Sequence, residues 1–410
     1  MANIVAMILA GGRVDDLGVL TFFRPKSGLP FGGLYRIIDF PMSNLINSGI
    51  EKVGILSQYR PFRLIRHIAS GEPWDLTGRN RCAIILPPFK GRGESDWYKG
   101  TADAVYQNID FLRLHRPDLV LILSGDHIYR MDYRHLIRFH MDKKADLTIA
   151  CAKVDQEGSS RFGLARIDDE EPRGGEVIQY VEKPRESKLE WASLTIYVFK
   201  TDLLIDALNA NASKNSHEFG KDIIPTFLAN KKVYAYKHYG YWGYTRTPDE
   251  YWQANMDLLG AAPKVNLKEY RLRTNMAHRE IRDRAPAFIG FSGKVEDSLF
   301  YSGCRVEGTA IRSILFPGVR IEKNATVTDS ILFFDAIVRE GSVVYRTIAD
   351  ADTNLGSGAE VGDPRGELSI IGRATRIPPG IKIEGGVSVF PNLNEESFRE
   401  SVYKKGDIVE

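Results

Sequence analysis

Asp126 is the residue whose type and position are best suited to chemistry. It follows Leu119–Leu123, an apolar run typical of a buried strand, within the sequence Ser-Gly-Asp-His-Ile-Tyr. A carboxylate at the C-terminal end of a strand is well placed to hold Mg²⁺ against nucleotide phosphates. An Asp in a loop also commonly caps the turn that follows it, so the spacing alone leaves both interpretations open.

A glycine turn near the N-terminus is the second candidate. Val5–Leu9 suits a buried parallel strand, and Ala10, Gly11 and Gly12 follow it directly. Small residues there let backbone N–H groups approach a phosphate closely. Basic residues follow nearby: Arg24, Lys26 and Arg36. The combination suggests a nucleotide site, although it lacks the Walker A and G-x-G-x-x-G patterns, and a tight turn with solvated charges is the alternative.

Two later motifs are open to a functional and a plainer interpretation. Gly100 and Thr101 open a predicted helix, where free backbone N–H groups can bind a base or an anion, but an ordinary capped helix has the same pattern. Glu182 and Lys183 precede a proline at the end of a predicted strand. The lysine could neutralise a sugar phosphate while the glutamate binds sugar hydroxyls, whereas a surface ion pair is the commoner arrangement.

Strands and helices alternate up to about residue 260. The other predicted strands are Lys52–Leu56 and Asp146–Cys151. The predicted helices are Arg60–Ile68, Ala102–Leu112, Tyr133–Lys143 and Pro248–Leu259. This alternation is typical of an α/β fold with a mostly parallel sheet, in which ligands bind beyond the C-terminal strand ends. The Gly11–Gly12 loop and residues 124–127 should therefore face one crevice.

Residues 261–285 carry many charges, and we interpret them as a linker. From Pro286 onwards the hydrophobic pattern of the sequence changes. Single aliphatic residues then recur about every six positions among Gly, Ser, Thr, Asn and Asp. Examples are Ile321 and Val327, Ile337 and Val343, and Leu355 and Val361. A six-residue period predicts a left-handed parallel β-helix over 286–410, with an antiparallel sandwich as the alternative.

Composition excludes several classes of protein. The 410 residues suit two domains, and a net charge of +2 favours neither nucleic-acid binding nor strong attraction to membranes. We find no apolar run of about 18 residues and no basic segment of a secretory signal at the N-terminus. Three cysteines are far apart: Cys82, Cys151 and Cys304. We expect buried free thiols in a cytoplasmic protein.

Residues Leu29–Phe40 and Ser43–Ile50 carry the most specific pattern, LPFGGLYRIIDF and SNLINSGI. They resemble the N-terminus of the ADP-glucose pyrophosphorylase (glucose-1-phosphate adenylyltransferase) family, which has P-F-G-G-x-Y-R-x-I-D-F and S-N-x-x-N-S-G-I. The resemblance covers both domains. It implies a Rossmann-like nucleotidyltransferase sheet over 1–260, a linker over 261–285 and a left-handed β-helix over 286–410. It also implies that ATP and glucose 1-phosphate give ADP-glucose and pyrophosphate with Mg²⁺, for glycogen synthesis.

The resemblance assigns roles to the candidate residues. Those for the nucleotide are Ala10, Gly11, Gly12, Gln58, Gly100 and Thr101. Those for the sugar phosphate are Tyr98, Gly163, Glu182, Lys183 and Ser193. Asp126 becomes a catalytic metal ligand, and Lys26 becomes a catalytic cation.

Several positions depart from the family pattern. Asp16 stands where the family has a catalytic arginine, and Tyr244 stands where the Y-W-x-D-V-G-T motif has its second metal aspartate. Arg246 replaces the glycine of that motif. Thr195 replaces a glycine, and Glu218 replaces an aspartate near the sugar, where one more methylene could crowd a hexose.

Two functions follow from these departures. One is a catalytically weak or inactive regulatory subunit that binds ATP, glucose 1-phosphate or ADP-glucose and acts with a catalytic paralogue in a tetramer. The other is an active adenylyltransferase with a rearranged site, in which Lys26 or Arg246 replaces the arginine. A β-helix acyltransferase would fit only the C-terminal domain, which lacks an obvious catalytic histidine. Because the loop and strand charges are exchanged, one hypothesis is that Asp16 and Arg246 pair and close the crevice, and independent drift of the two positions is the alternative.

Overall fold

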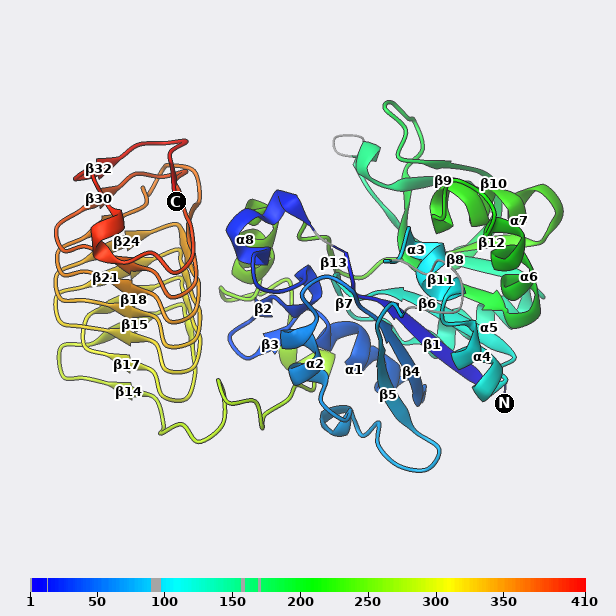
Figure 1. Cartoon of the computed structure of the whole chain (residues 1–410), viewed down its shortest axis with the longest axis horizontal. Coiled ribbons are helices and arrows are strands. Elements are labelled where there is room, and N and C mark those ends of the chain that lie inside the picture. Colours follow the sequence, from blue (N-terminus) through cyan, green and yellow to red (C-terminus); the bar gives the residue numbers. More distant parts are fainter. Residues whose placement is uncertain (1, 13, 90–96, 156–158, 169–170) are drawn as a thin grey trace. The chain divides into compact units, whose positions relative to one another are not determined.

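The chain forms two compact units in a computed structural model that describes residues 2–12, 14–89, 97–155, 159–168 and 171–410 (Figure 1). The sheet unit comprises Met1–Gly12, Ile38–Trp242 and Arg271–Arg273. The β-helix unit comprises Arg13–Ile37, Gly243–Tyr270 and Thr274–Glu410. Each unit is thus assembled from separate stretches of the chain, while the predicted boundaries at 260 and 285 remain a prediction. Among the helices described, none is long and apolar enough to cross a membrane.

The sheet unit contains a nine-stranded sheet in the order β5-β4-β1-β6-β11-β8-β12-β10-β9. Its strands are β1 (Ile4–Leu9), β4 (Lys52–Leu56), β5 (Cys82–Leu86), β6 (Leu119–Ser124), β8 (Leu147–Lys153), β9 (Gly163–Ile167), β10 (Gly174–Glu182), β11 (Trp191–Lys200) and β12 (Val233–His238). Only β10 and β11 run against the other strands of this sheet. The predicted α/β fold with a mostly parallel sheet is confirmed.

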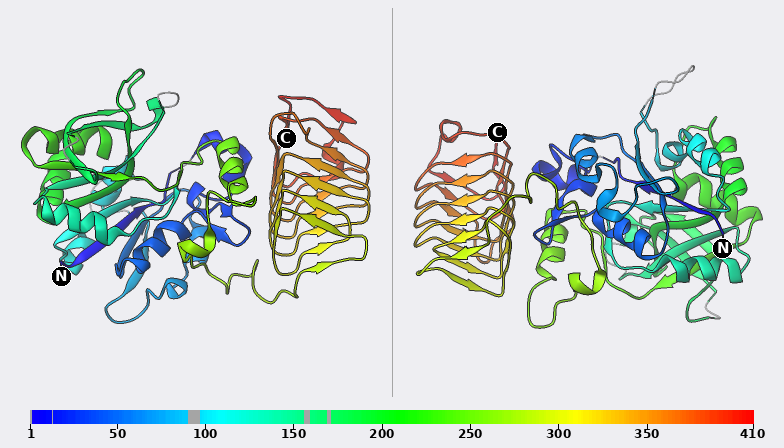
Figure 2. Two further views of the ribbon diagram at one scale, coloured as in Figure 1. Left: turned by 180° about the vertical axis from the view of Figure 1, so that it is seen from behind. Right: turned by 90° about the horizontal axis from the view of Figure 1, so that it is seen from below.

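Helices cover both faces of this sheet (Figures 1 and 2). They are α1 (Asp39–Asn47), α2 (Phe62–Ile68), α3 (Thr101–Tyr106), α4 (Ile109–His115), α5 (Tyr133–Asp142), α6 (Thr201–Asn211) and α7 (Ile224–Asn230). Alternate residues of β1 enter two cores: Val5 and Met7 pack with α3, α4, α6 and α7, whereas Ala6 and Ile8 pack with α1, α2 and α5. Because both faces of β1 are buried, its sequence is a continuous apolar run.

One predicted helix is wrong in its extent. Ala102–Leu112 forms the two helices α3 and α4, which are separated at Gln107 and Asn108. The Asn108 side chain donates hydrogen bonds to the Ala104 carbonyl oxygen and the Tyr98 hydroxyl. Asparagine favours such local bonds over a continuous helix, and the apolar periodicity did not reveal them.

Short elements complete the chain. They are β2 (Pro30–Phe31), β3 (Tyr35–Arg36), β7 (Ile128–Tyr129), β13 (Trp242–Gly243), α8 (Pro248–Met256), α9 (Leu267–Tyr270), a π-helical turn at Phe219–Ile223, and 3₁₀ turns at Asp15–Thr21, Lys26–Gly28, Glu72–Trp74, Ser159–Arg161 and Glu395–Ser397. The strands β2 and β3 pair as an antiparallel ribbon.

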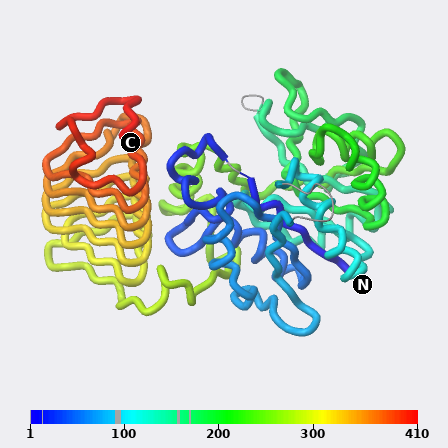
Figure 3. The backbone as a smooth tube through the Cα atoms, in the orientation of Figure 1, coloured from blue at the N-terminus to red at the C-terminus, as the bar shows by residue number. Residues whose placement is uncertain are grey.

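Residues 286–410 form three parallel sheets, and the stacked coils are visible in the tube of Figure 3. The first sheet holds β14 (Phe288–Ile289), β17 (Arg305–Val306), β20 (Arg320–Ile321), β23 (Ile337–Val338), β26 (Asn354–Leu355) and β29 (Arg376–Ile377). The second holds β15 (Lys294–Glu296), β18 (Thr309–Ile311), β21 (Thr326–Thr328), β24 (Val343–Tyr345), β27 (Glu360–Val361), β30 (Lys382–Ile383) and β32 (Val402–Tyr403). The third holds β16 (Leu299–Phe300), β19 (Ile314–Leu315), β22 (Ile331–Leu332), β25 (Thr347–Ala349), β28 (Ser369–Ile371), β31 (Ser388–Val389) and β33 (Ile408–Val409). The predicted left-handed parallel β-helix is confirmed.

The six-residue period is correct, but its phase is wrong at one pair. Val338 and Val344 are fully buried and belong to the interior column, whereas Ile337 and Val343 are only half-buried. Both strands carry two adjacent aliphatic residues, so the sequence does not show which of the two faces inward. The pairing register settles it, because Val338 aligns with Ile321 and Leu355 in neighbouring coils.

The outer side of the third sheet also carries aliphatic residues. Ile314, Ile331, Ile348 and Ile370 align in register and are buried, although they alternate with the residues of the interior column. The Asp15–Thr21 turn lies against β28, and α8 lies nearby because the Trp252 indole donates a hydrogen bond to the Asp329 carbonyl oxygen. Segments from outside the coils therefore complete the core of the β-helix unit.

Candidate functional site

The predicted nucleotide loop lies beside the predicted metal loop within the sheet unit. Leu9 pairs with Ser124, and the Gly125 N–H donates a hydrogen bond to the Leu9 carbonyl oxygen. The two loops therefore lie side by side at one edge of the sheet, and that they face one crevice stays a prediction. A Cβ atom at Gly11 would lie 2.8 Å from the backbone nitrogen of Gln58. The chain just after β4 therefore leaves room only for glycine at position 11. At Gly12 a Cβ would meet no described atom within 4 Å, which leaves room for a ligand.

Gln58 and Tyr98, predicted to contact the base and the sugar phosphate, are bonded to each other. The Gln58 carboxamide oxygen accepts from the Tyr98 N–H at 2.7 Å, and its nitrogen donates to the Tyr98 carbonyl oxygen at 3.4 Å. The Tyr98 hydroxyl donates to the Leu86 carbonyl oxygen, and burial raises its pKa to about 12. These bonds hold the segment after residue 96 against the ends of β4 and β5.

The start of α3 is already capped. The Thr101 hydroxyl donates to the Glu218 carboxylate at 2.6 Å and the Thr101 N–H does so at 3.3 Å. The Ala102 N–H donates to the His217 carbonyl oxygen, and a Cβ at Gly100 would overlap that same oxygen. The capped-helix interpretation of this motif therefore describes the structure, and the longer Glu218 side chain supplies the cap. A nucleobase contact at Gly100 and Thr101 stays a prediction.

Apart from Tyr98, the residues predicted for the sugar phosphate lie on three strands or directly after one of them. Gly163 on β9 is the register partner of Glu182 on β10, and Ser193 lies on β11 with its hydroxyl 3.2 Å from that of Tyr197. Lys183 has a φ of 46° and places its ammonium 3.9 Å from a Glu182 carboxylate oxygen. A non-glycine residue in this left-handed region costs free energy and often marks a functional site.

Asp126 accepts a hydrogen bond from the Ser124 hydroxyl, and its carboxylate oxygen lies 3.5 Å from the His127 ring nitrogen. Its side chain is about one-quarter exposed. No set of three or more His, Cys, Asp or Glu side chains in the described part of the chain is placed to hold a metal ion. A single carboxylate still fits Mg²⁺, because this ion takes most of its ligands from water and phosphates.

Asp16, Lys26, Tyr244 and Arg246 form a cluster in the β-helix unit. The Arg246 Nε atom donates to Asp16 at 2.6 Å, and its Nη1 atom donates to the Tyr244 hydroxyl at 3.3 Å. The predicted pairing of Asp16 with Arg246 is confirmed, and the bond to Asp16 raises the pKa of Arg246 above its usual value. The Lys26 ammonium donates to the Tyr244 carbonyl oxygen at 2.5 Å and lies 4.8 Å from the centre of its ring. That the Asp16–Arg246 pair closes a nucleotide site stays a prediction.

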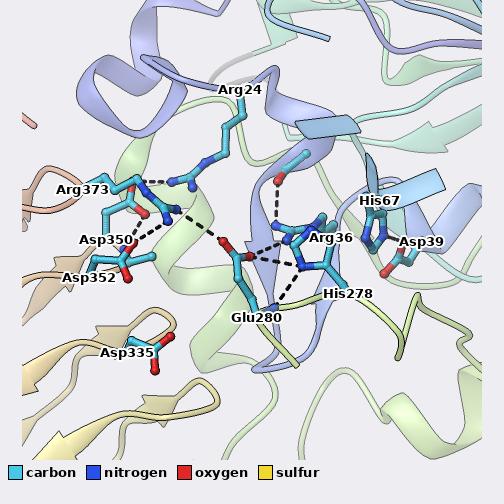
Figure 4. Close-up of polar contacts among 12 residues, drawn as sticks. Arg24, Arg36, Asp39, His67, His278, Glu280, Asp335, Asp350, Asp352 and Arg373 are labelled. Atoms are coloured by element: carbon cyan, nitrogen blue, oxygen red, sulfur yellow. Dashed lines mark hydrogen bonds and ion pairs between the residues drawn. The ribbon is translucent and has the colours of Figure 1, made fainter. Parts of the chain in front are cut away.

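A second charged cluster in the β-helix unit was missed from the sequence (Figure 4). Arg24 and Asp350 form an ion pair at 2.5 Å, with side chains only 2% and 3% exposed. Glu280 contacts Arg36 at 2.8 Å, Arg373 at 3.5 Å and His278 at 3.6 Å. Apart from His278 and Glu280, these partners lie far apart in sequence, and no local pattern marks them. Arg24 and Arg36 therefore hold the β-helix unit together in this structure.

Glu280 gives this cluster a pH dependence. Burial raises its pKa, but the charges of Arg36, His278 and Arg373 outweigh that effect and lower it to about 2 from 4.5. A lowered pKa in the folded state means that Glu280 stabilises the fold above pH 4.5 and that this contribution is lost as the pH falls towards 2. We expect Glu280→Gln to show a smaller loss of stability than the unaltered chain when urea denaturation is compared between about pH 6 and pH 3. Equal losses would contradict the assignment.

Thr195 occupies a position that favours glycine. Its φ is 54°, a left-handed conformation that costs a β-branched residue about 1–2 kcal/mol. Thr195→Gly should therefore stabilise the chain by about 1 kcal/mol in thermal or chemical denaturation. Thr226→Gly within α7 is the matched control and should destabilise it by a few tenths of a kcal/mol, because glycine is a poor helix former. Destabilisation by Thr195→Gly would contradict this account.

The fold and the arrangement of the site define a nucleotidyl transferase domain joined to a hexapeptide β-helix. Residues 5–260 match the Nucleotidyl transferase family and residues 289–368 match the GlmU-like C-terminal hexapeptide family. The chain is 40% identical to the glucose-1-phosphate adenylyltransferase of Thermotoga neapolitana, over 100% of this chain and 99% of that relative. It is 45% identical to that of Geobacillus stearothermophilus, over 79% and 82%, and 46% identical to that of Clostridium botulinum, over 80% and 84%. The chain belongs to the glucose-1-phosphate adenylyltransferase family.

Proposed function

We propose that this chain binds the ligands of a glucose-1-phosphate adenylyltransferase but turns them over weakly, and that it serves as a regulatory subunit. The observation that supports this most directly is the Asp16–Arg246 ion pair beside Tyr244. By resemblance, Asp16 and Tyr244 stand at the positions of the catalytic arginine and the second metal aspartate. The chain therefore has an acid where the triphosphate needs a cation, and a neutral phenol where the metal needs a carboxylate.

The electrostatic argument is simple. Attack of a sugar phosphate oxygen on the α-phosphorus of ATP, with release of pyrophosphate, is accelerated mainly by positive charge placed around the phosphates. The carboxylate of Asp16 repels the negatively charged phosphates, and the ion pair with Asp16 offsets the positive charge of Arg246. Tyrosine is a poor Mg²⁺ ligand, since its hydroxyl has a pKa near 10 and would have to lose a proton.

Ligand binding is proposed to survive because its residues are present in the sheet unit. Asp126 would hold Mg²⁺, which would neutralise part of the triphosphate charge. Gly11 and Gly12, with Ala10, would let backbone N–H groups approach the phosphates. The base would lie near Gln58, Gly100 and Thr101, and the sugar phosphate near Tyr98, Gly163, Glu182, Lys183 and Ser193.

Two assays on the purified chain test this proposal. Calorimetry with ATP, glucose 1-phosphate and ADP-glucose should show weak binding of at least one nucleotide and of the sugar phosphate. Pyrophosphorolysis of ADP-glucose should be far slower than for a relative with an intact arginine loop and Y-W-x-D motif. Absence of all binding would refute the first half, and ordinary turnover by the chain alone would refute the second.

The second candidate is an active enzyme with a rearranged site. It is favoured by one observation: Arg246 and Lys26 keep two cations within the same cluster, and the Arg246 side chain is 38% exposed. If Arg246 replaces the missing arginine, Arg246→Ala should abolish pyrophosphorolysis. In a chain that serves as a regulatory subunit, the same variant should change little.

We also propose a tetramer, made of this chain alone or together with a catalytic paralogue. The first coil of the β-helix exposes several large apolar side chains: Phe288, Ile289, Phe291 and Phe300. The strands β14, β15 and β16 each form one edge of their sheets, and open edges of this kind favour association. Light scattering that reports a monomer at micromolar concentration would contradict this proposal.

A further inference from the structure

Tyr180 lies against the carboxylate that is proposed to bind the sugar. Tyr180 and Glu182 are two residues apart on β10, so their side chains lie on the same face of the strand. The Tyr180 hydroxyl donates a hydrogen bond to the Glu182 Oε2 atom at 2.8 Å. The other oxygen, Oε1, is 3.9 Å from the Lys183 ammonium. The two carboxylate oxygens therefore have different surroundings.

Two glycines leave the space that this pair occupies. A Cβ at Gly163 on β9 would overlap the Tyr180 hydroxyl and would lie 2.6 Å from Glu182 Oε2. A Cβ at Gly220, in the π-helical turn, would overlap Glu182 Oε2 as well. Any larger residue at either position would displace the hydroxyl or the carboxylate. Gly163 thus has a structural reason to be glycine that does not depend on a direct ligand contact.

The Tyr180 hydroxyl stays protonated at ordinary pH and therefore remains a hydrogen-bond donor. Burial, followed by the neighbouring Tyr197 and the charge of Glu182, raises the pKa of Tyr180 well above its usual value. A neutral hydroxyl that donates to a carboxylate forms a charge-assisted bond, which is stronger than a bond between neutral groups. It also restricts a glutamate side chain that would otherwise lose considerable rotamer freedom when a ligand binds.

We propose that Tyr180 is a positioning residue of the sugar site, which orients Glu182 by holding its Oε2 atom so that Oε1 accepts hydrogen bonds from the hexose hydroxyls. This inference rests on the proposed function, because it requires that Glu182 contacts the sugar. Tyr180 itself need not touch the ligand. It prearranges the carboxylate, so that its loss should weaken recognition of the sugar ring and leave recognition of phosphate and nucleotide unchanged.

The test is Tyr180→Phe, measured by calorimetry on the whole chain. Affinity for glucose 1-phosphate should fall about ten-fold, the usual effect of one hydrogen bond to a charged group. Affinity for methyl phosphate, which has no ring hydroxyls, and for ATP should stay unchanged. The preference for glucose 1-phosphate over galactose 1-phosphate should decrease. Tyr234→Phe, on β12 of the same sheet, is the matched control and should leave all four affinities unchanged.

A second variant separates positioning from loss of the hydroxyl. Gly220→Ala keeps the Tyr180 hydroxyl but places a methyl group where Glu182 Oε2 lies, so it should reproduce the selective loss. If the unaltered chain binds no glucose 1-phosphate, the proposed function fails and this inference fails with it. If it does bind, unchanged affinity in Tyr180→Phe overturns the inference alone. Equal losses for glucose 1-phosphate and methyl phosphate would also overturn it.

Discussion

The triple variant Asp16→Arg/Tyr244→Asp/Arg246→Gly is expected to catalyse pyrophosphorolysis of ADP-glucose roughly 10²–10⁵-fold faster than the unaltered chain. It restores a cation at position 16 and a carboxylate at position 244, and it removes the arginine that pairs with Asp16 in the structure. Mutagenesis of such phosphate-binding cations and metal carboxylates in other enzymes has effects of this size. Initial rates with ADP-glucose, pyrophosphate and Mg²⁺ measure the change.

The single variants show whether the two departures act together. Asp16→Arg alone should remain near the starting rate, because its guanidinium would face Arg246 at the position of a 2.6 Å ion pair. Arg246→Gly alone should also be slow, since it leaves an acid in the loop. If Asp16→Arg is as active as the triple variant, the linked exchange of charges is wrong. If a folded triple variant binds the ligands without any gain in rate, restoration of these positions is not sufficient and the proposal fails.

Arg24→Leu is expected to destabilise the β-helix unit by about 3–5 kcal/mol. It would leave the Asp350 carboxylate, which is 3% exposed, without its partner at 2.5 Å. Arg24 also donates from Nε to the Leu20 carbonyl oxygen and lies 5.5 Å from the centre of the Phe333 ring. Urea denaturation measures the loss, and hydrogen exchange should place it in residues 13–37 and in the coil that contains Asp350.

A matched control uses an exposed pair. Arg305→Leu breaks the Arg305–Glu307 pair, whose arginine is 60% exposed, and should cost at most about 1 kcal/mol. The double variant Arg24→Leu/Asp350→Leu should be more stable than Arg24→Leu alone, because no unpaired charge remains buried. Equal costs for Arg24→Leu and Arg305→Leu would show that burial of the Arg24–Asp350 pair has no energetic consequence.

Local patterns in the sequence predicted most of the fold. The apolar run at Val5–Leu9 and the six-residue period after Pro286 depend on neighbours along the chain, and both correspond to observed elements. The phase at Ile337 could not be read, because two adjacent aliphatic residues fit either side of a strand. The antiparallel direction of β10 and β11 was also not visible, since hydrophobicity does not encode strand direction.

The site was predicted less completely, for a physical reason. The Asp16–Arg246 contact could be predicted because both residues depart from family motifs and carry opposite charges. Asp16 stands where the family has an arginine, and Arg246 stands where it has a glycine. The Arg24–Asp350 contact could not be predicted, because its partners are 326 positions apart and no motif contains them. The resemblance assigns the Gln58 side chain to a base, which stays a prediction, and it did not indicate that this side chain also binds the backbone of Tyr98. A sequence pattern indicates which chemistry a side chain can perform. It does not indicate which hydrogen-bond partners that side chain already has in the folded protein.

The separation between Arg24 and Asp350 has a consequence for biosynthesis. Residues 13–37 emerge from the ribosome long before the coils against which they pack in the β-helix unit. At roughly 5–20 residues per second, this segment waits on the order of tens of seconds for Asp350 to be made. Its apolar residues Leu17 and Leu20, which are buried in the finished protein, stay accessible to chaperones or to other nascent chains during that interval. The synthesis of the coil that contains Asp350 therefore determines when residues 13–37 can reach their final packing.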